Sequence, residues 1–226
     1  MTLKENLQYI HQKIEAAAKR AGRQPEQVCL VAVSKRKPIE AIQQAIDKGQ
    51  QCFGENYLQE ALGKIAHFPK STWHFIGRIQ SNKTREIAQN FDVVETVDRL
   101  KVALALDKHL AVLGKKMEAY IQVNLGGEGQ KAGIAPEELE SLVEQFKNFS
   151  HLTLVGLMTL PPYNADPELS RPYFRQLRQL ALSLEAKKLI DAPLGLSMGM
   201  SGDFEVAVEE GATVVRVGTA IFGERE

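Results

Sequence analysis

The sequence has few cysteines, and its pattern of apolar residues contains no long run. Cys29 and Cys52 are the only two cysteines, and they lack the spacing of a zinc site or a redox motif. The apolar runs are far shorter than the roughly 18 apolar residues of a membrane helix, and an N-terminus with Lys4 and Glu5 does not resemble a signal sequence. We therefore expect a cytoplasmic protein with no membrane association, no structural metal and two buried, reduced thiols rather than a redox pair.

The chain also has no formal net charge. The 28 basic and 28 acidic side chains cancel, which argues against a general nucleic-acid-binding protein, because such proteins need a basic excess to displace counterions from phosphates. The total hides an uneven distribution. The first 48 residues carry nine basic and five acidic side chains, whereas the last thirty carry two and six. This asymmetry predicts a basic region in the N-terminal part of the chain.

The 226 residues are enough to bury a large apolar core without a disulfide or a metal. Hydrophobic residues make up 44% and charged residues 25% of the chain, which is typical of globular proteins. The composition shows no break that would mark a linker. We therefore expect residues 1–226 to form a single domain.

Apolar runs alternate with helical patterns from one end of the chain to the other. Apolar residues three to four apart predict an amphipathic helix over 3–20, and the unbroken apolar run 28–33 predicts a strand buried on both faces. Further strands are predicted at 50–54, 72–77, 92–97, 118–124, 152–158, 193–198 and 212–217. Further helices are predicted at 38–48, 56–66, 82–90, 98–112, 136–147, 167–187 and 202–210.

Eight strands separated by helices predict an α/β fold, a single closed (β/α)8 TIM barrel with an extra N-terminal helix. The alternative is an open doubly wound sheet, which usually has a glycine-rich turn after its first strand. Here that turn runs from Ser34 to Pro38 and contains no glycine. The barrel is therefore favoured, and its ligand site is expected at the carboxyl ends of the strands.

Basic and polar residues follow the predicted strands. Basic side chains follow the first and third strands, which predicts an anionic ligand; they are Lys35, Arg36, Lys37, Arg78, Lys83 and Arg85. Lys35 directly ends an apolar strand, where an apolar wall would favour the neutral amine that attacks carbonyl groups. The segment from Ser197 to Ser201 leads into a predicted helix with Ser201 as N-cap, and together with Gly218 and Thr219 it is typical of a phosphate-binding site.

Seven motifs in order resemble one family. They are Val31-Ala-Val-Ser-Lys35, Phe53-Gly-Glu-Asn-Tyr57, His74-Phe-Ile-Gly77 with Gln80-Ser-Asn-Lys83, Gln130-Lys-Ala-Gly133, Gly156-Leu-Met-Thr159, Leu196-Ser-Met-Gly-Met-Ser201 and Val215-Arg-Val-Gly-Thr-Ala-Ile-Phe-Gly223. On these motifs the sequence closely resembles the pyridoxal phosphate homeostasis proteins, the YggS/PROSC group of PLP-binding proteins. The resemblance covers nearly the whole chain.

The resemblance implies a barrel like the cofactor domain of alanine racemase (fold type III PLP proteins), with pyridoxal 5′-phosphate (PLP) held as a Schiff base on Lys35. It further implies that Asn56 lies near the polar edge of the ring and that Arg216 faces the pyridine nitrogen. The phosphate would be held by Ser197, Ser201, Gly218 and Thr219. Two structural alternatives remain open at this point: Asn56 as a helix cap, and Arg216 as a structural arginine paired with an acid such as Glu55 or Asp203.

The resemblance implies PLP and amino-acid homeostasis, with the protein acting as a carrier or buffer rather than as a turnover enzyme. The sequence ends just after the eighth strand, so we expect no second racemase domain. Expected partners are PLP itself and PLP-dependent apoenzymes, and the expected state is a monomer. One alternative is an amino-acid racemase using Tyr57, His74 or Lys83 as acid and base. A phosphosugar isomerase-like barrel using Glu55 is the other.

Overall fold

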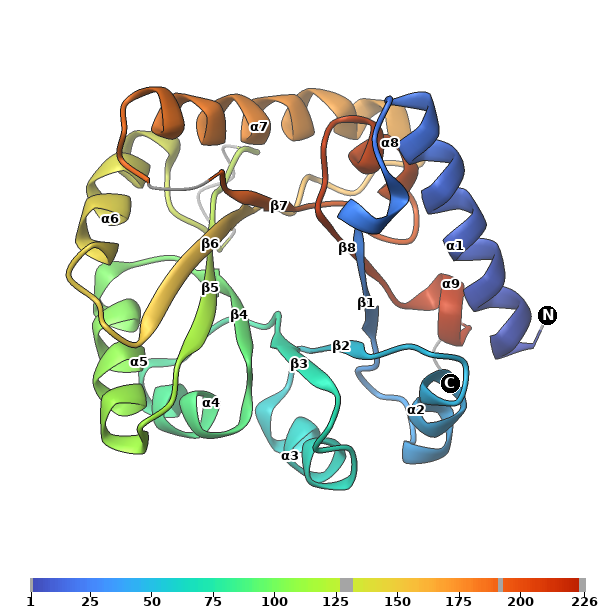
Figure 1. Ribbon diagram of the computed structural model, residues 1–226, viewed down its shortest axis with the longest axis horizontal. Helices are drawn as coiled ribbons and strands as arrows, with labels where there is room; N and C mark the ends of the chain where they lie inside the picture. Colours follow the sequence, from blue (N-terminus) through green and yellow to red (C-terminus); the bar gives the residue numbers. More distant parts are fainter. Residues whose placement is uncertain (1, 127–131, 191–192, 224–226) are drawn as a thin grey trace.

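In the computed structural model, which describes residues 2–126, 132–190 and 193–223, eight parallel strands close into a barrel in chain order (Figure 1). The strands are β1 (Cys29–Val33), β2 (Cys52–Glu55), β3 (Thr72–Phe75), β4 (Val93–Val97), β5 (Met117–Gln122), β6 (Leu152–Met158), β7 (Gly195–Ser197) and β8 (Val214–Val217). The helices are α1 (Leu3–Arg20), α2 (Ile39–Ile46), α3 (Leu58–His67), α4 (Thr84–Asn90), α5 (Leu100–Leu113), α6 (Leu139–Phe146), α7 (Arg171–Ala186), α8 (Phe204–Glu209) and α9 (Thr219–Phe222).

The pairing of β1 distinguishes a barrel from an open sheet. Ala32 in β1 pairs with Phe53 in β2 on one side and with Val217 in β8 on the other. The first strand therefore has no free edge, and the predicted closed barrel is confirmed. Because parallel neighbours need a crossover connection, the helices between successive strands lie on the outside of the barrel (Figure 1).

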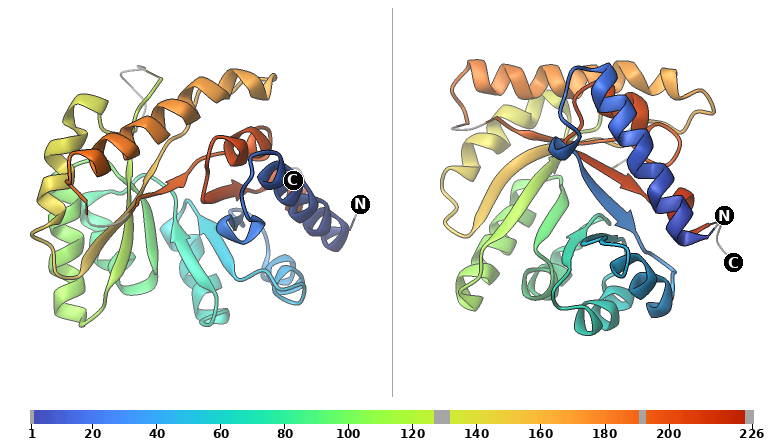
Figure 2. Two further views of the ribbon diagram at one scale, coloured as in Figure 1. Left: turned by 45° about the horizontal axis from the view of Figure 1, so that its top comes forward. Right: turned by 45° about the vertical axis from the view of Figure 1, so that its right-hand side comes forward.

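The extra N-terminal helix α1 begins with a capping box. The Thr2 hydroxyl accepts from the backbone N–H of Glu5 at 3.3 Å, and the Glu5 carboxylate accepts from the Thr2 N–H at 2.7 Å. Leu7, Ile10 and Ile14 are buried along one face of the helix. The helix lies along the outside of the barrel beside α8 and α9, so it covers the wall where the chain closes on itself (Figure 2).

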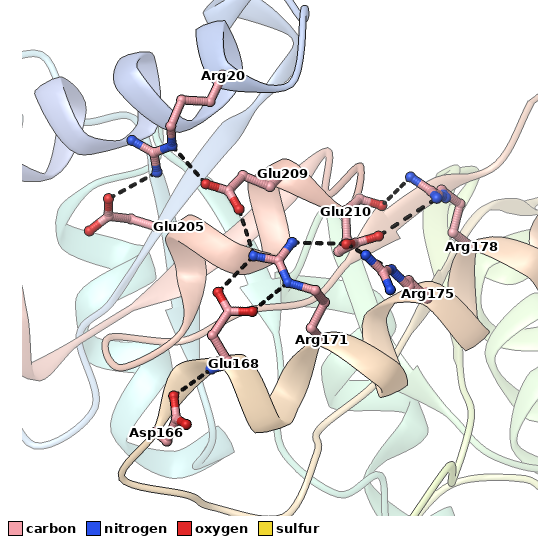
Figure 3. A network of polar contacts seen from close by, with 9 residues as sticks. All are labelled: Arg20, Asp166, Glu168, Arg171, Arg175, Arg178, Glu205, Glu209 and Glu210. Atoms are coloured by element: carbon pink, nitrogen blue, oxygen red, sulfur yellow. Dashed lines mark hydrogen bonds and ion pairs between the residues drawn. The ribbon is translucent and has the colours of Figure 1, made fainter.

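A network of ion pairs joins α1 to α7 through α8 (Figure 3). Arg20 on α1 contacts Glu209 at 2.7 Å, and Arg171 on α7 contacts Glu209 at 2.7 Å and Glu210 at 2.9 Å. Arg175 adds a second guanidinium to Glu210 at 3.0 Å. Single surface pairs contribute little, but the side chain of Glu210 is only 5% exposed and shares several partners. The network therefore fixes α8, which follows one of the loops of the site.

Two helices begin later than predicted, and one short helix was not predicted. The helix predicted at 202–210 begins only at Phe204, because Gly199 has a φ of +92° and the chain forms a turn over the following residues. The four-residue helix α9 was not predicted, being too short to show a period. The helix predicted from 167 starts with a 3-10 turn, and α7 proper begins at Arg171. Among the described residues, no helix is long and apolar enough to cross a membrane.

Candidate cofactor site

A cavity of about 430 Å³ opens at the carboxyl ends of the strands, as expected for this fold. Six of the seven residues predicted from the sequence line it: Lys35, Asn56, Ser201, Arg216, Gly218 and Thr219. They follow or end β1, β2, β7 and β8, which are separated in the sequence but adjacent in the barrel. Val33, Ile76 and Met158 add an apolar wall. The half-buried Lys35 thus lies where an apolar surface meets polar groups.

The turn that carries Lys35 is held from below by a buried polar cluster. The Nζ atom of Lys64 donates to the backbone oxygen of Ser34 at 2.7 Å and to Oε1 of Glu55 at 2.8 Å. The Ser34 hydroxyl donates to the same Glu55 oxygen at 2.7 Å. Sequence reasoning missed Lys64, because nothing in the pattern of α3 shows that a lysine there points inward. Its contacts fix the backbone immediately before Lys35.

Glu55 is fully buried, but its partners are incomplete. Its Oε1 accepts from Ser34 and Lys64, whereas Oε2 has no hydrogen-bond partner among the described residues. Burial raises the pKa of this carboxyl, and Lys64 opposes the rise. Glu55 does not line the cavity.

Asn56 presents an unpaired polar atom next to the cavity. Its Oδ1 is buried and has no hydrogen-bond partner among the described residues. The following helix begins at Leu58 with Tyr57 as N-cap and with no side-chain capping bond, so the helix-cap alternative for Asn56 was wrong. A Cβ atom at Gly77 would lie 2.1 Å from the Asn56 backbone oxygen, so that glycine lets the two loops meet. An unsatisfied buried amide oxygen suits a ligand that donates a hydrogen bond.

Arg216 lies within β8, and the residue is both buried and next to the cavity. Its Nη2 donates to the backbone oxygen of Thr159 at 3.0 Å, and its Nη1 lies 3.5 Å from Oε2 of Glu95. Arg216 does have an acidic partner, but the predicted Glu55 or Asp203 was wrong as the directly contacting residue. Burial lowers the pKa of Arg216, and the Glu95 carboxylate opposes this. The arginine therefore presents a fixed cation with donors only.

Ser197 does not line the cavity. Its hydroxyl donates to Oε2 of Glu95 at 2.6 Å and accepts from Nη1 of Arg216, and the residue is fully buried. The reason is its position within β7, where it pairs with Met158 of β6 and its side chain points into the barrel. The structure thus places Ser197 behind Arg216, and its predicted contact with phosphate has no support from this geometry.

Ser201 lines the cavity. The sequence predicted it as the N-cap of α8, and this prediction was wrong. Its hydroxyl accepts from the backbone N–H groups of Gly218 and Ala220 at 3.3 and 3.4 Å, and so joins the loops after β7 and β8. The residue before α8 is Asp203, whose carboxylate accepts from the Met200 N–H at 2.7 Å. Both Ser201 contacts are longer than the usual N–H···O distance and are therefore weak.

A buried dyad of His74 and Glu95 lies inside the barrel beneath Arg216. The Nδ1 atom of His74 lies 2.7 Å from Oε1 of Glu95. Burial alone would lower the pKa of His74, but contacts with Cys52 and Glu95 raise it to about 9. Burial would raise the pKa of Glu95, but the contacts with His74, Arg216 and Ser197 lower it. Glu95 was missed, although an acid in the apolar strand 93–97 requires a buried partner.

The predicted basic mouth was only partly correct. Within the described part of the chain, Lys35 and Arg216 are the only cationic side chains that line the cavity. Arg36 instead lies over the Tyr57 ring, with 5.8 Å between its guanidinium carbon and the ring centroid, and Lys83 pairs with Glu86. In the motif at 130–133, Gln130 and Lys131 lie outside the described residues.

The comparisons with known proteins agree with one another. The family model "Alanine racemase, N-terminal domain" matches residues 6–226. A pyridoxal phosphate homeostasis protein of Vibrio cholerae is 45% identical, over 100% of this chain and 97% of the relative. The structure of PipY from Synechococcus elongatus with PLP bound has a TM-score of 0.82 and 37% identity, covering 93% of this chain and 100% of PipY.

The resemblance to a racemase is one of fold. An alanine racemase of Clostridium difficile has a TM-score of 0.75 at 14% identity, and the match covers 97% of this chain but 57% of the racemase. The full-length relatives and the family model together establish the assignment. The chain belongs to the alanine racemase N-terminal domain family and, within it, to the pyridoxal phosphate homeostasis proteins.

Proposed function

We propose that this protein binds pyridoxal 5′-phosphate covalently through Lys35 and serves PLP and amino-acid homeostasis as a carrier or buffer. The observation that carries the proposal is the position of Lys35 at the end of β1, on a cavity that it shares with Asn56 and Arg216. The names of the full-length relatives and the PLP in the PipY structure support the same cofactor.

The residues of the cavity fit this cofactor. PLP supplies an aldehyde, which condenses with a primary amine and releases water. Lys35 supplies that amine beside the apolar wall of Val33 and Ile76, while the Lys64 cluster holds its backbone. The unpaired Oδ1 of Asn56 is available to a hydroxyl donor, such as the one on the pyridine ring.

A phosphate fits the loops after β7 and β8. Ser201 brings a hydroxyl and the backbone of Gly218 to the same wall of the cavity, with Thr219 beside them. Helix α9 has only four residues, so its contribution is its first N–H donors rather than a helix dipole. We assign Ser197 a different task, which is to hold Arg216 in place.

The same geometry favours cofactor handling over turnover. Arg216 offers donors only, so a pyridine nitrogen next to it would stay unprotonated and the ring would withdraw electrons weakly. None of the three acid–base candidates for a racemase lines the cavity in the described structure. Tyr57 lies outside it, stacked with Arg36; His74 is buried against Glu95; and Lys83 pairs with Glu86.

The first test is titration of the protein with PLP, followed by borohydride reduction. We expect a visible absorbance change and one fixed cofactor per chain in the wild type. Lys35→Ala should lose both. Lys37→Ala is the matched control, because Lys37 is two residues away, does not line the cavity and contacts the Phe222 backbone oxygen. An unchanged adduct in Lys35→Ala would overturn the assignment.

Two further measurements separate the possible roles. A racemase must exchange the α-proton of its substrate, so the carrier proposal expects no deuterium uptake from solvent into a panel of amino acids. A delivery role predicts faster transfer of PLP from the loaded protein to an apoenzyme than release into buffer. Equal rates would leave storage as the function and remove PLP-dependent apoenzymes as direct partners.

A further inference from the structure

The opposite, amino-terminal end of the barrel carries the only two cysteines of the chain. Cys29 begins β1 and Cys52 begins β2, and both are half-buried rather than fully buried as the sequence suggested. Both pack against the cluster inside the barrel that contains Val31, Tyr120 and Val214. The two side chains thus face the barrel interior, and both residues remain partly exposed. They lie outside the proposed cofactor site.

Four neighbouring strands, β1 to β4, each contribute one residue to a row of polar side chains inside the barrel. The residues are Cys29, Cys52, His74 and Glu95. Cys52 pairs with Thr72 of β3, so His74, two residues further along, points into the barrel on the same face. His74 is thus the diagonal neighbour of Cys52 on the next strand, and its Nδ1 lies 2.7 Å from Oε1 of Glu95 on β4. Because Glu95 also holds Arg216, the row runs from the amino end of the barrel to the cavity.

The charges along this row favour an ionised sulfur at Cys52. Its contacts with Cys29 and with His74 lower the pKa of the Cys52 thiol. The contact with Cys52, together with burial, raises the pKa of the Cys29 thiol, which therefore keeps its proton. The raised pKa of His74 and the lowered pKa of Glu95 favour an imidazolium beside Cys52, paired with the Glu95 carboxylate.

We propose that the Cys29–Cys52 pair is a thiol-modification site, at which the Cys52 thiolate exchanges with low-molecular-weight disulfides. The Cys52 sulfur attacks one sulfur of the external disulfide, a new S–S bond forms, and the other half leaves as a thiolate with the electron pair of the broken bond. Cys29 keeps its proton and donates its S–H to the Cys52 sulfur before the attack. His74 supplies the balancing positive charge.

The positions of the two cysteines favour an external partner over a disulfide between them. Ala32 pairs with Phe53, which places Cys52 beside Val31 and places Cys29 one diagonal step away. Adjacent strands lie about 4.8 Å apart and two residues span about 6.6 Å along a parallel strand, so diagonal neighbours lie about 8 Å apart between Cα atoms. A disulfide spans about 4.4–6.8 Å. The described residues also contain no group of three metal-ligating side chains, so the thiols are not part of a candidate metal site.

The test is the rate at which the folded protein reacts with dithiobis(nitrobenzoate), an aromatic disulfide, at pH 6. An ordinary thiol with a pKa of about 8.5 is about 0.3% ionised at that pH, whereas Cys52 is expected to be mostly ionised. Its lower basicity reduces its nucleophilicity, so the expected net gain over free cysteine is about tenfold. One thiol per chain should react in this fast phase.

Variants identify the groups involved. Cys52→Ser should abolish the fast phase, and Cys29→Ser should retain it, because a hydroxyl also donates to the sulfur. His74→Gln should slow it severalfold and move the midpoint of the rate–pH curve toward about 8.5. If His74→Gln does not fold, Cys29→Ala should move the midpoint in the same direction. A fast phase that survives in Cys52→Ser, or a wild-type midpoint near 8.5, would overturn the proposal.

Discussion

Glu55 and Glu95 are both fully buried in the same barrel, on β2 and β4, but their carboxyl pKa values shift in opposite directions. Only one oxygen of Glu55 has partners, namely Ser34 and Lys64. Both oxygens of Glu95 have them, since Oε1 contacts His74 and Oε2 contacts Ser197 and Arg216. Burial raises the pKa of both carboxyls, and the comparison shows that only the larger set of partners around Glu95 reverses that rise.

The two clusters also serve the cavity differently. The Glu55 cluster fixes the backbone of the turn that carries Lys35, whereas the Glu95 cluster fixes the side chain of Arg216. A substitution in the Glu55 cluster should therefore displace the amine of Lys35. A substitution of Glu95 should leave the buried Arg216 cation without its anion, which lowers the free energy of unfolding more.

The largest effect is expected for Glu95→Gln. Both Arg216 and protonated His74 lose their negative partner, so the free energy of unfolding should fall by about 3–5 kcal/mol. Urea unfolding monitored by circular dichroism measures this change. A loss below about 1 kcal/mol would show that the anion of Glu95 is not what stabilises the cluster.

High pH should weaken the same cluster in the wild type. The pKa of His74 is raised from 6.5 to about 9, so its stabilising contribution is complete below pH 6.5 and is lost as the pH rises through 9. We expect the free energy of unfolding to fall by about 2–3 kcal/mol between these pH values. His74→Gln keeps a donor for Glu95 but cannot titrate, and a pH dependence that persists in this variant would refute the explanation.

Glu55→Gln should have a much smaller effect than Glu95→Gln. The glutamine oxygen can still accept from Ser34 and Lys64, and Lys64 retains its ion pair with Glu60. We expect the free energy of unfolding to change by at most about 1 kcal/mol. Equal losses in Glu55→Gln and Glu95→Gln would remove the distinction between the two carboxyls.

The smallest effect on stability is expected for Asn56→Ala. Its Oδ1 has no partner to lose, so the free energy of unfolding should stay within about 0.5 kcal/mol of the wild type. If a PLP hydroxyl uses this oxygen, the affinity for PLP should fall about fivefold, equivalent to one hydrogen bond of about 1 kcal/mol. Isothermal titration and urea unfolding of the same preparation separate the two quantities, and an unchanged affinity would exclude this contact.

The barrel was predictable from the sequence because each strand is a short apolar run followed by a helical pattern, which local residues are sufficient to reveal. Most of the cavity was predictable for a related reason. Polar residues at strand ends, such as Lys35 and Asn56, must meet at one end of a parallel barrel. The resemblance to a family then named their tasks, which the structure by itself leaves as predictions.

The directions and partners of interior side chains could not be predicted. Ser197 and Glu95 are 102 positions apart, and their hydrogen bond depends on the register of strands across the barrel. Lys64 points inward to Glu55 and the Ser34 backbone oxygen, and both partners lie on other elements that its own helix does not reveal. Ser201 has the sequence context of an N-cap, but the turn after Gly199 makes α8 begin only at Phe204. The Ser201 hydroxyl therefore accepts from the backbone of Gly218 in the loop after β8.

The most direct test of the proposed function is peptide mapping of the wild-type protein after it has been loaded with PLP and reduced with borohydride. Lys35 should carry the modification in nearly all molecules, and the peptide containing Lys64 should be unmodified, because its amine is buried in ion pairs with Glu55 and Glu60. A fixed cofactor on any lysine other than Lys35, with Lys35 unmodified, would contradict this account of the site.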